Sequence, residues 1–267
     1  MVICPICQAP LSTDGPSWRC ENGHCFDVAR QGYVNLLPVQ QKHSLHPGDS
    51  RPMVEARRNF LSAGYYVPIA KTMAELVKAH APEARCVLDA GCGEGYYLSF
   101  LENIPERWGI DISKEAVRMA AARDKSAHWL TATAAHLPFG NCSFDCVLSM
   151  FALTAEEEFC RVLKPGGIFL QVLAGPDHLL GLKNIIYPKI LHKEKEQHKV
   201  FPGFDLTCSR TLEFDFELND REMVHNLLCM TPHVNRISKE GAEALDATEH
   251  LKDRAQVVFN VYSKPRK

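Results

Sequence analysis

Three glycines at alternate positions follow directly on a short apolar run, in the stretch "VLDAGCGEGYY" of residues 87–97. Gly91, Gly93 and Gly95 leave the backbone bare, and a bare backbone can approach a bound molecule closely. In a doubly wound α/β sheet such a turn lies at the carboxyl ends of the strands, where ligands bind. The stretch therefore predicts a fold class and a ligand site together.

The rest of the chain from residue 85 alternates between strand and helix patterns. Apolar runs typical of strands lie at 85–90, 107–111, 127–132, 144–150 and 167–173, and two later ones at 210–219 and 254–264. Helical patterns lie at 96–103, 113–124, 155–163, 176–190 and 220–230, after two helices at 53–63 and 67–79. Alternation of this kind predicts an α/β fold with a parallel sheet covered by helices on both faces.

The charges around the glycine turn indicate which ligand it holds. Dinucleotide enzymes need a G-x-G-x-x-G turn to receive a pyrophosphate, whereas this turn is G-x-G-x-G. Asp89 precedes it, and an acid there repels phosphate but favours a cation. Asp111 ends the second strand and is placed to accept hydrogen bonds from ribose hydroxyls. S-adenosylmethionine has no phosphate and carries an ammonium and a sulfonium, so it is the expected cofactor.

The first 25 residues contain four of the eleven cysteines of the chain. Cys4 and Cys7 form a C-x-x-C pair, and Cys20 and His24 form a C-x-x-x-H pair, which together can close a tetrahedral zinc site. Cys25 could replace His24 as the fourth ligand, but Gly23 lets the backbone turn His24 back towards the metal. We predict a structural zinc ion held by Cys4, Cys7, Cys20 and His24.

Composition limits the remaining possibilities. The chain has 267 residues with 30 Lys and Arg against 32 Asp and Glu, so no overall basic field indicates a nucleic-acid partner. We find no run near the roughly 20 apolar residues of a membrane helix and no pattern of a signal peptide. Cysteines without export signals indicate metal ligands and buried thiols. The expected location is cytoplasmic, without a membrane partner.

Several stretches together resemble a known family. "VLDAGCGEGYY", "GIDIS", "HLPFGNCSFDCVLS" and "RVLKPGG" resemble the motifs of class I methyltransferases. "CPICQAPL", "GYVNLLPVQ", "PGDS", "ARRNFLSAGYY", "GPDHL" and "MTP" resemble the RlmA family, and "LLPVQ" is closer to its Gram-negative type. The resemblance implies a Rossmann-like class I methyltransferase fold with a small N-terminal zinc-ribbon-like domain. It implies methyl transfer to N1 of a guanine in a hairpin of 23S rRNA.

The resemblance also implies domain bounds and site residues. The expected division is a zinc-binding RNA-recognition domain at 1–40, a linker with helices at 41–84 and a methyltransferase domain at 85–267. The same four zinc ligands are implied. The implied cofactor-binding residues are Tyr66, Asp89, Gly91, Gly93, Gly95, Tyr97, Leu98, Asp111, Ile112 and His178. The stretch "TATAAHLPF" lacks the acidic residue that binds adenine in many class I enzymes, so Ala134, Ala135 or His136 would supply that contact.

The sequence also indicates how the substrate would be bound. No residue is named as the base that removes the guanine N1 proton. Basic residues of the N-terminal and linker segments and of 183–199 would contact RNA phosphates, with Trp18 or a tyrosine stacking on a base. A homodimer is implied by the resemblance. The alternatives are a methyltransferase of a small, quinone-type metabolite, one of a different rRNA nucleotide, and a binding module without activity.

Overall fold

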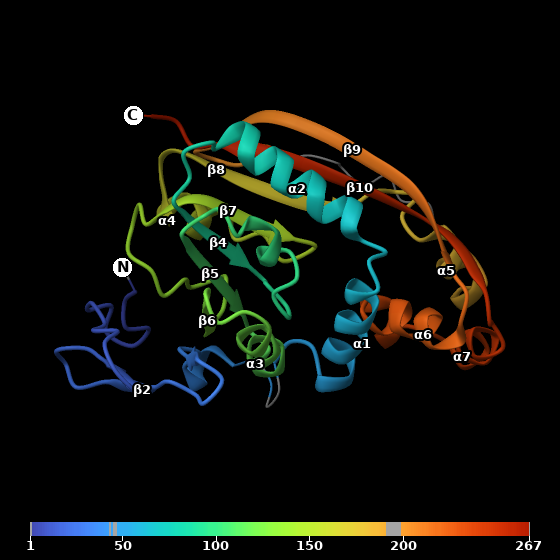
Figure 1. Cartoon of the computed structure of the whole chain (residues 1–267), viewed down its shortest axis with the longest axis horizontal. Helices are drawn as coiled ribbons and strands as arrows, with labels where there is room; N and C mark the ends of the chain where they lie inside the picture. The colour runs from blue at the N-terminus through green and yellow to red at the C-terminus, as the bar shows by residue number, and fades with distance from the viewer. Residues whose placement is uncertain (1, 43, 45–46, 191–198, 267) are drawn as a thin grey trace.

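The computed structural model describes residues 2–42, 44, 47–190 and 199–266. Within these residues, eight strands form one central sheet in the order β3-β6-β5-β4-β7-β8-β10-β9, and β1 and β2 form a separate pair (Figure 1). The strands are β1 (Ser17–Arg19), β2 (Cys25–Asp27), β3 (Tyr33–Asn35), β4 (Cys86–Ala90), β5 (Glu106–Asp111), β6 (His128–Thr131), β7 (Phe144–Met150), β8 (Leu163–Ala174), β9 (Asp205–Leu218) and β10 (Leu251–Ser263).

The strand order has a reversal that positions the site. The chain runs outward from β4 to β5 and β6, returns to pair β7 on the other side of β4, and continues to β8. These strands are parallel, whereas β10 pairs antiparallel with β8 and with β9. A reversal between β4 and β7 opens a crevice beyond their carboxyl ends. The predicted doubly wound α/β fold is confirmed.

Three of the helices in the described residues begin at side-chain caps. They are α1 (Arg51–Ser62), α2 (Val67–His80), α3 (Lys114–Arg123), α4 (Glu156–Val162), α5 (Leu180–Ile186), α6 (Arg221–Cys229) and α7 (Lys239–Asp246), with 3-10 turns η1 (Val39–Gln41), η2 (Leu98–Leu101) and η3 (Pro232–Asn235). The side chains of Ser113, Asp220 and Ser238 accept hydrogen bonds from backbone N–H groups of α3, α6 and α7. Such caps satisfy donors that have no partner within the helix.

Two predicted helices are shorter than expected. The helix expected at 96–103 is only the 3-10 turn η2, because the Ser99 hydroxyl donates to the Tyr96 carbonyl and Pro105 follows closely. The helix expected at 176–190 is α5, which begins only at Leu180. The Asp253 carboxylate accepts the N–H groups of Gly181 and Leu182 and fixes that start.

Both faces of the sheet are covered, and the N-terminal segment takes part. One core contains residues of α1, α2, α5 and α6, such as Phe60 and Met73, packed with the sheet. The other contains Val2, Trp18 and Leu36 together with sheet residues and α4. Although β3 lies within the segment 1–40, it pairs with β6 at the edge of the main sheet. The zinc-binding segment therefore packs on the sheet rather than standing apart.

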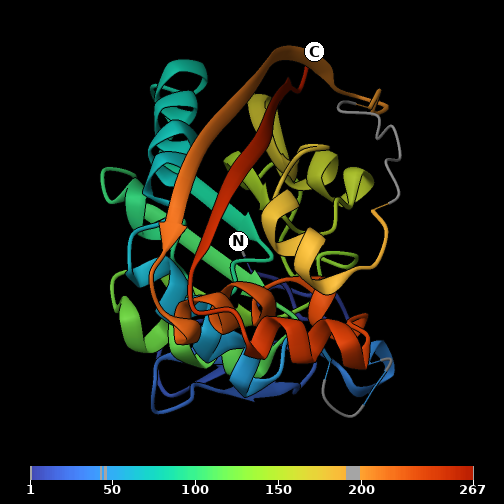
Figure 2. The same ribbon diagram turned by 90° about the vertical axis from the view of Figure 1, so that its right-hand side faces the viewer.

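The antiparallel pair at the other edge is long and curved. Figure 2 shows β9 and β10 running across the molecule to α6 and α7. No sequence pattern predicted the helix α7. Within the described residues, no helix combines the length and the apolar character needed to cross a membrane.

Candidate functional site

The four predicted zinc ligands converge at one point. The ligand atoms of Cys4, Cys7, Cys20 and His24 all lie within 4.8 Å of one another. Cys7 Sγ lies 3.7 Å from Cys20 Sγ, and His24 Nδ1 lies 3.5 Å from Cys4 Sγ and 3.4 Å from Cys20 Sγ. With Zn–S near 2.3 Å and Zn–N near 2.0–2.1 Å, a tetrahedral ion would separate two sulfurs by about 3.8 Å and sulfur from nitrogen by about 3.6 Å. The cluster fits zinc.

Two tight turns bring these ligands together. Gln8 N–H donates to Cys4 O in the first turn, and Gly23 N–H donates to Cys20 O in the second, where Gly23 has φ +83°. Cys25 lies in β2 with an exposed side chain and is not part of the cluster. The Asn22 side chain lowers the pKa of Cys7 to about 6, whereas burial raises that of Cys4. A thiolate at Cys7 is the form that binds metal.

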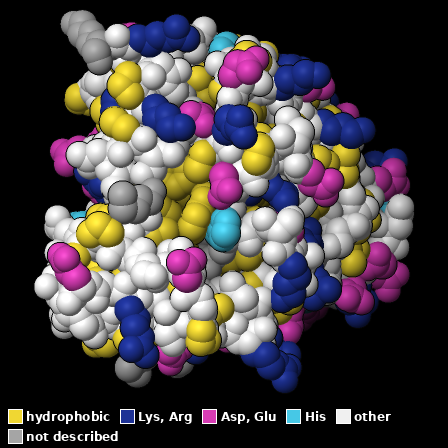
Figure 3. Space-filling view, turned by 60° about the vertical axis from the view of Figure 1, so that its left-hand side comes forward, with side chains coloured by type: hydrophobic (Ala, Val, Ile, Leu, Met, Phe, Trp, Pro, Cys, Tyr) yellow, Lys and Arg dark blue, Asp and Glu magenta, His cyan; other side chains and the backbone are white. Residues whose placement is uncertain are grey.

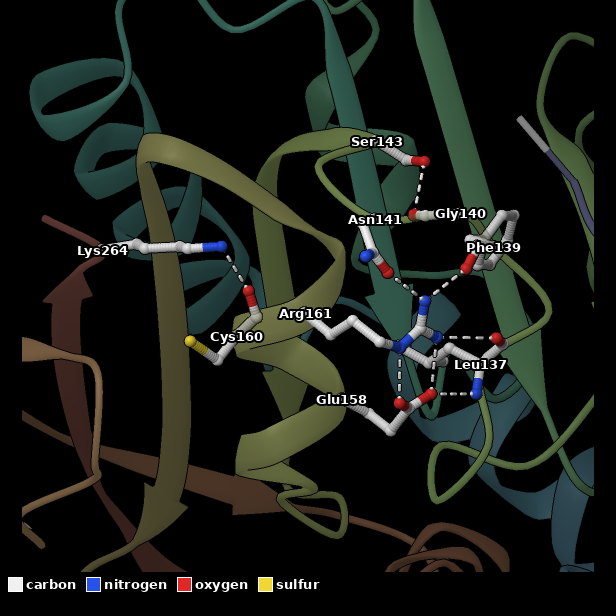
Figure 4. A network of polar contacts seen from close by, with 9 residues as sticks. All are labelled: Leu137, Phe139, Gly140, Asn141, Ser143, Glu158, Cys160, Arg161 and Lys264. Carbon is white, nitrogen blue, oxygen red and sulfur yellow. Dashed lines mark hydrogen bonds and ion pairs between the residues drawn. The ribbon is translucent and has the colours of Figure 1, made fainter. Parts of the chain in front are cut away.

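The zinc-binding segment is attached to the loop between β6 and β7. Ile3 N–H donates to Pro138 O at 2.9 Å, and Val2 forms an antiparallel bridge with Phe139. Arg161 of α4 fixes the same loop by donating to Phe139 O at 2.6 Å and to Leu137 O at 3.0 Å (Figure 4).

Glu158 completes this network. Its carboxylate accepts two hydrogen bonds from Arg161 and one from Leu137 N–H (Figure 4). The guanidinium and the backbone donor hold the pKa of Glu158 below its usual range although burial alone would raise it. One ion pair on α4 therefore positions the loop on which the zinc-binding segment docks.

The second candidate site is a cavity of about 370 Å³ at the carboxyl ends of β4, β5, β6 and β7. It lies at the reversal of strand order. Its lining contains Gly91, Gly93, Glu94 and Tyr97 of the glycine turn, Asp111 and Ile112 at the end of β5, Thr133 and Ala134 after β6, and Phe151, Ala152 and Leu153 after β7. A groove of about 740 Å³ between α5 and the β9–β10 pair is larger but lies away from the glycine turn.

The glycines are required by space as well as by backbone conformation. Gly91 has φ +96°, and a Cβ there would lie 2.5 Å from the Ala152 Cβ. Gly95 has φ +84°, and a Cβ there would lie 2.7 Å from the Trp129 ring. L-residues with a side chain avoid this backbone region. The turn can therefore pack against β6 and β7 only with glycine.

Asp111 joins the turn to the next strand. Its two carboxylate oxygens accept hydrogen bonds from Gly93 N–H at 3.0 Å and from Ser113 N–H at 2.8 Å. Burial raises its pKa, and these two donors oppose that rise. Each carboxylate oxygen has a second lone pair for a further donor. The residue can therefore still receive hydroxyl groups from a ligand.

Two further acids lie buried beside the cavity. Burial and the nearby Asp111 raise the pKa of Asp89 to about 7, and neither carboxylate oxygen of Asp89 has a hydrogen-bond partner within the described residues. Burial raises the pKa of Glu94 to about 7, although Arg123 lies 2.7 Å from its carboxylate. Buried carboxylates with incomplete partners favour a cation nearby. This charge pattern fits a ligand with an ammonium and a sulfonium.

The segment before α1, expected as part of the linker at 41–84, closes one side of the cavity. Gly48 and Asp49 line it, and Ser113 Oγ donates to Asp49 O at 2.6 Å. Arg57 of α1 also lines the cavity, and its guanidinium lies 2.7 Å from Asp49 Oδ2. Within the described lining, Arg57 is the one Lys or Arg side chain. The "PGDS" motif, which contains Gly48 and Asp49, was the one sequence signal for this part of the cavity. Its distance along the chain from the glycine turn follows no known spacing, so the contact between them was not predicted.

The other predicted cofactor residues lie outside this lining. Asp89, Gly95 and Leu98 are buried behind it, and Ala135 and His136 are exposed beyond Ala134. Tyr66 and His178 are brought together, with Tyr66 Oη 3.4 Å from His178 Nε2, and both are largely buried. Burial raises the pKa of Tyr66. The His178 ring is stacked on Phe151, which lines the cavity.

Comparisons with known proteins bear on both sites. Residues 2–45 match the family model described as "RlmA, N-terminal", and residues 88–171 match that of a methyltransferase domain. The chain is 35% identical over 240 residues to the 23S rRNA (guanine(748)-N(1))-methyltransferase of Streptomyces fradiae, covering 86% of this chain and 84% of that one. It is 32% identical over 246 residues to the "Putative 23S rRNA (guanine-N(1)-)-methyltransferase YxjB" of Bacillus subtilis (strain 168), covering 87% and 86%.

A relative of another kind matches only part of the chain. The malonyl-[acyl-carrier protein] O-methyltransferase of Herminiimonas arsenicoxydans is 34% identical over 155 residues, which cover 54% of this chain and 57% of that enzyme.

Proposed function

The chain belongs to the RlmA family of 23S rRNA (guanine-N1-)-methyltransferases, and from that membership we propose that it transfers a methyl group from S-adenosylmethionine to N1 of a guanine in a hairpin of 23S rRNA. The observation that carries the proposal is the pairing of two sites in one chain. A Cys₃His cluster that fits zinc is docked on the same sheet whose reversal point holds an acidic, glycine-lined cavity. The malonyl-[acyl-carrier protein] O-methyltransferase matches only 54% of this chain.

Residues of the cavity are proposed to hold the cofactor by its separate charges. Asp111 would accept the ribose hydroxyls, and Gly91 and Gly93 would leave room for the methionine part. Arg57 is the cationic side chain of the described lining and would pair with the carboxylate of the cofactor. Ile112 and Ala134 would flank the adenine.

Tyr97, which lines the cavity, is also proposed to contact the cofactor. Asp89 and Gly95 lie behind the cavity wall and are proposed to support the cofactor site from there. The Asp89 carboxylate, which has no hydrogen-bond partner in the described part of the chain, would stabilise the cofactor's positive charges through space, because a buried charge is poorly screened. Tyr66, Leu98, Ala135, His136 and His178, also implied by the resemblance, are proposed as supporting residues.

The chain's contribution to the chemistry is largely positional. The bound cofactor supplies an activated methyl group that a ring nitrogen can attack in line. The protein's residues hold the cofactor and the acceptor in line at near-attack distance, which can supply much of the acceleration. The guanine N1 proton must leave as the bond forms, and N1 lies on the Watson–Crick edge. The target guanine must therefore be unpaired or flipped out before transfer.

The zinc-binding segment is proposed to recognise the RNA hairpin, with Cys4, Cys7, Cys20 and His24 as zinc ligands. On the face shown in Figure 3, Lys and Arg side chains are interspersed with acidic ones, in line with the net charge of −2. RNA contact would therefore come from local groups rather than from one basic field. Trp18, expected to stack on a base, is only 8% exposed and packs in the core. Lys193 and Lys195 lie outside the described residues.

The domain bounds 1–40, 41–84 and 85–267, the homodimer and the cytoplasmic location are likewise proposed from the resemblance. A dimer would double the RNA-contacting surface. Light scattering coupled to size-exclusion chromatography measures the mass of the zinc-loaded protein. A mass near twice 30.0 kDa is expected, and a single-chain mass at micromolar concentration would contradict the dimer.

The activity is tested by transfer of labelled methyl from S-adenosylmethionine to ribosomal RNA from a strain that lacks the gene. Digestion to nucleosides should place the label in 1-methylguanosine of 23S rRNA. Label in another nucleoside would overturn the target assignment and retain the enzyme class. Label only in an extract freed of RNA would favour the small-metabolite alternative, and failure to bind the cofactor would favour a module without activity.

A further inference from the structure

We propose that Phe151 is the stacking platform for the target guanine, with Leu153 extending its apolar surface. The proposal rests on the proposed function and adds the residue that receives the base. It is carried by the exposure of Phe151, its backbone conformation, the side chains that brace its ring and its place at the cavity.

Phe151 is unusual among the aromatic residues in being exposed. Within the described part of the chain, it is the most exposed Phe, Tyr or Trp, with 36% of its surface accessible. Leu153, two residues later, is 73% exposed. Both line the cofactor cavity, together with the buried Met150. Large apolar side chains next to a site are a feature of surfaces that receive a ligand.

The backbone holds Phe151 in this position at a cost. Its φ is +55°, a left-handed conformation that is disfavoured for a residue with a side chain. Its N–H donates to Val172 O of β8 at 2.9 Å, and the following Ala152 packs against Gly91, leaving no room for a Cβ there. Strained backbone that is fixed by its surroundings is concentrated at functional sites.

Buried rings brace the side chain from within. The Phe151 ring is stacked on His178 at a centroid distance of 6.1 Å and 27°, and it is tilted against Tyr97 at 6.3 Å. The His178 ring is itself fixed, because Gln256 N–H donates to its Nδ1 and Tyr66 Oη lies 3.4 Å from its Nε2. Phe151 therefore does not collapse into the core, and part of its ring remains available at the cavity.

The chemistry of the target identifies the occupant. A guanine that presents N1 must leave its base pair and its neighbours, and enzymes receive such bases by stacking them on aromatic or apolar side chains. Trp18, which together with a tyrosine was expected from the sequence as a residue that could stack on an RNA base, is buried. Phe151 lies beside the glycine turn, next to Ala152, which contacts Gly91. A base stacked on it would lie at the cofactor cavity.

The test uses steady-state methylation of a 23S rRNA hairpin by the zinc-loaded, full-length protein. F151A is expected to lower kcat/KM for RNA by about 10- to 100-fold, in line with the cost of removing a stacking aromatic. F151W is expected to stay within about threefold of the unsubstituted protein because it keeps a π-face. L206A, at an exposed position of β9, is the matched control and should leave kcat/KM unchanged. All variants should bind S-adenosylhomocysteine as the unsubstituted protein does.

A second measurement separates stacking from a structural role. A hairpin with an abasic site in place of the target guanine offers no base to stack, so F151A should not weaken its binding further. Equal weakening of guanine and abasic hairpins, or unchanged kcat/KM for F151A, would overturn the proposal. If F151A loses cofactor binding, F151L serves in its place, with a smaller but measurable loss of kcat/KM expected because Leu keeps an apolar surface but not the π-face. Absence of methyl transfer to RNA by the unsubstituted protein would instead contradict the proposed function.

Discussion

The metal cluster and the cofactor cavity lie on the same sheet but are assembled differently. The cluster takes its four ligands from between Cys4 and His24, and two tight turns place them. The cavity takes its lining from segments between Gly48 and Leu153, which only the strand order brings together. The first site is a product of local chain geometry, and the second is a product of the whole fold.

The difference predicts how each site fails. A short segment buries too little apolar surface to order itself, so its stability depends on the bound metal. The cavity depends instead on close packing between turns that a single methyl group can disturb. Substitutions should therefore act through metal loss in one site and through steric exclusion in the other.

Loss of a zinc ligand should have the largest effect. Cys20→Ser is expected to remove bound zinc and to disorder the N-terminal segment, because structural zinc contributes about 10–16 kcal/mol of apparent binding free energy. Metal analysis and protease digestion of the first 40 residues measure both results. Cys25→Ser is the matched control, since Cys25 is an exposed neighbour outside the cluster, and it should retain one zinc per chain. Zinc loss in both variants would contradict the ligand assignment.

A methyl group at the glycine turn should have the next largest effect. Gly91→Ala places a Cβ 2.5 Å from the Ala152 Cβ, so it should weaken cofactor binding at least about 100-fold, or about 2.7 kcal/mol. Calorimetric titration with S-adenosylhomocysteine measures it. Gly32→Ala has the same backbone requirement, with φ +97°, but open space around it. That control should lose some stability and keep its affinity; equal losses of affinity would show that strain, and not the close approach, matters.

Removal of Arg161 tests how the two regions are joined. Arg161→Met removes the guanidinium donor from the Phe139 carbonyl and one of the two donors from the Leu137 carbonyl, and should lower the free energy of unfolding by about 2–3 kcal/mol. Hydrogen exchange at Ile3, which donates to Pro138 of the same loop, should accelerate. Arg118→Met removes a comparable but more exposed pair with Glu115 and should cost no more than about 0.5 kcal/mol. Unchanged hydrogen exchange at Ile3 would show that the Arg161–Glu158 network does not hold the zinc-binding segment on the loop between β6 and β7.

The smallest expected effect is a pH dependence of cofactor binding. With the pKa of Asp89 raised to about 7, the carboxylate gains its charge as pH rises, and a cationic ligand favours that form. From pH 6 to pH 8, affinity for S-adenosylmethionine should rise by about tenfold. The stability of the ligand-free protein should change in the opposite direction. A raised pKa stabilises the fold below the unfolded value of Asp89, and this contribution is lost as pH rises through 7.

Asp89→Asn should flatten the affinity profile. Glu94 titrates in the same range, so Glu94→Gln is the companion variant and should keep the part of the slope that belongs to Asp89. A profile that Asp89→Asn leaves unchanged would contradict the role given to Asp89.

The sequence predicted the parts of these sites that depend on neighbouring residues. The zinc spacing, the strand before Gly91 and the position of Asp111 at the end of β5 all follow local patterns, and the alternation of strands and helices predicted the sheet. The contribution of Gly48 and Arg57 to the cavity wall could not be predicted, because it depends on α1 packing beside the sheet.

The same limit applies to aromatic exposure. Trp18 and Phe151 are equally apolar in the sequence, and only the fold buries one and exposes the other. The edge strand β3 and the helix α7 were also missed, since short segments become ordered through their tertiary partners.

The most direct test of the account is primer extension on 23S rRNA that has been treated with the protein and S-adenosylmethionine. A methyl group at N1 blocks the Watson–Crick edge, so reverse transcriptase should stop at one guanine of a hairpin, and only when protein and cofactor are both present. The position of the guanine at which the stop occurs also tests whether the chain is of the Gram-negative type of the family, as "LLPVQ" indicates. Methyl incorporation into 23S rRNA without any such stop would place the group on another atom and contradict the central claim.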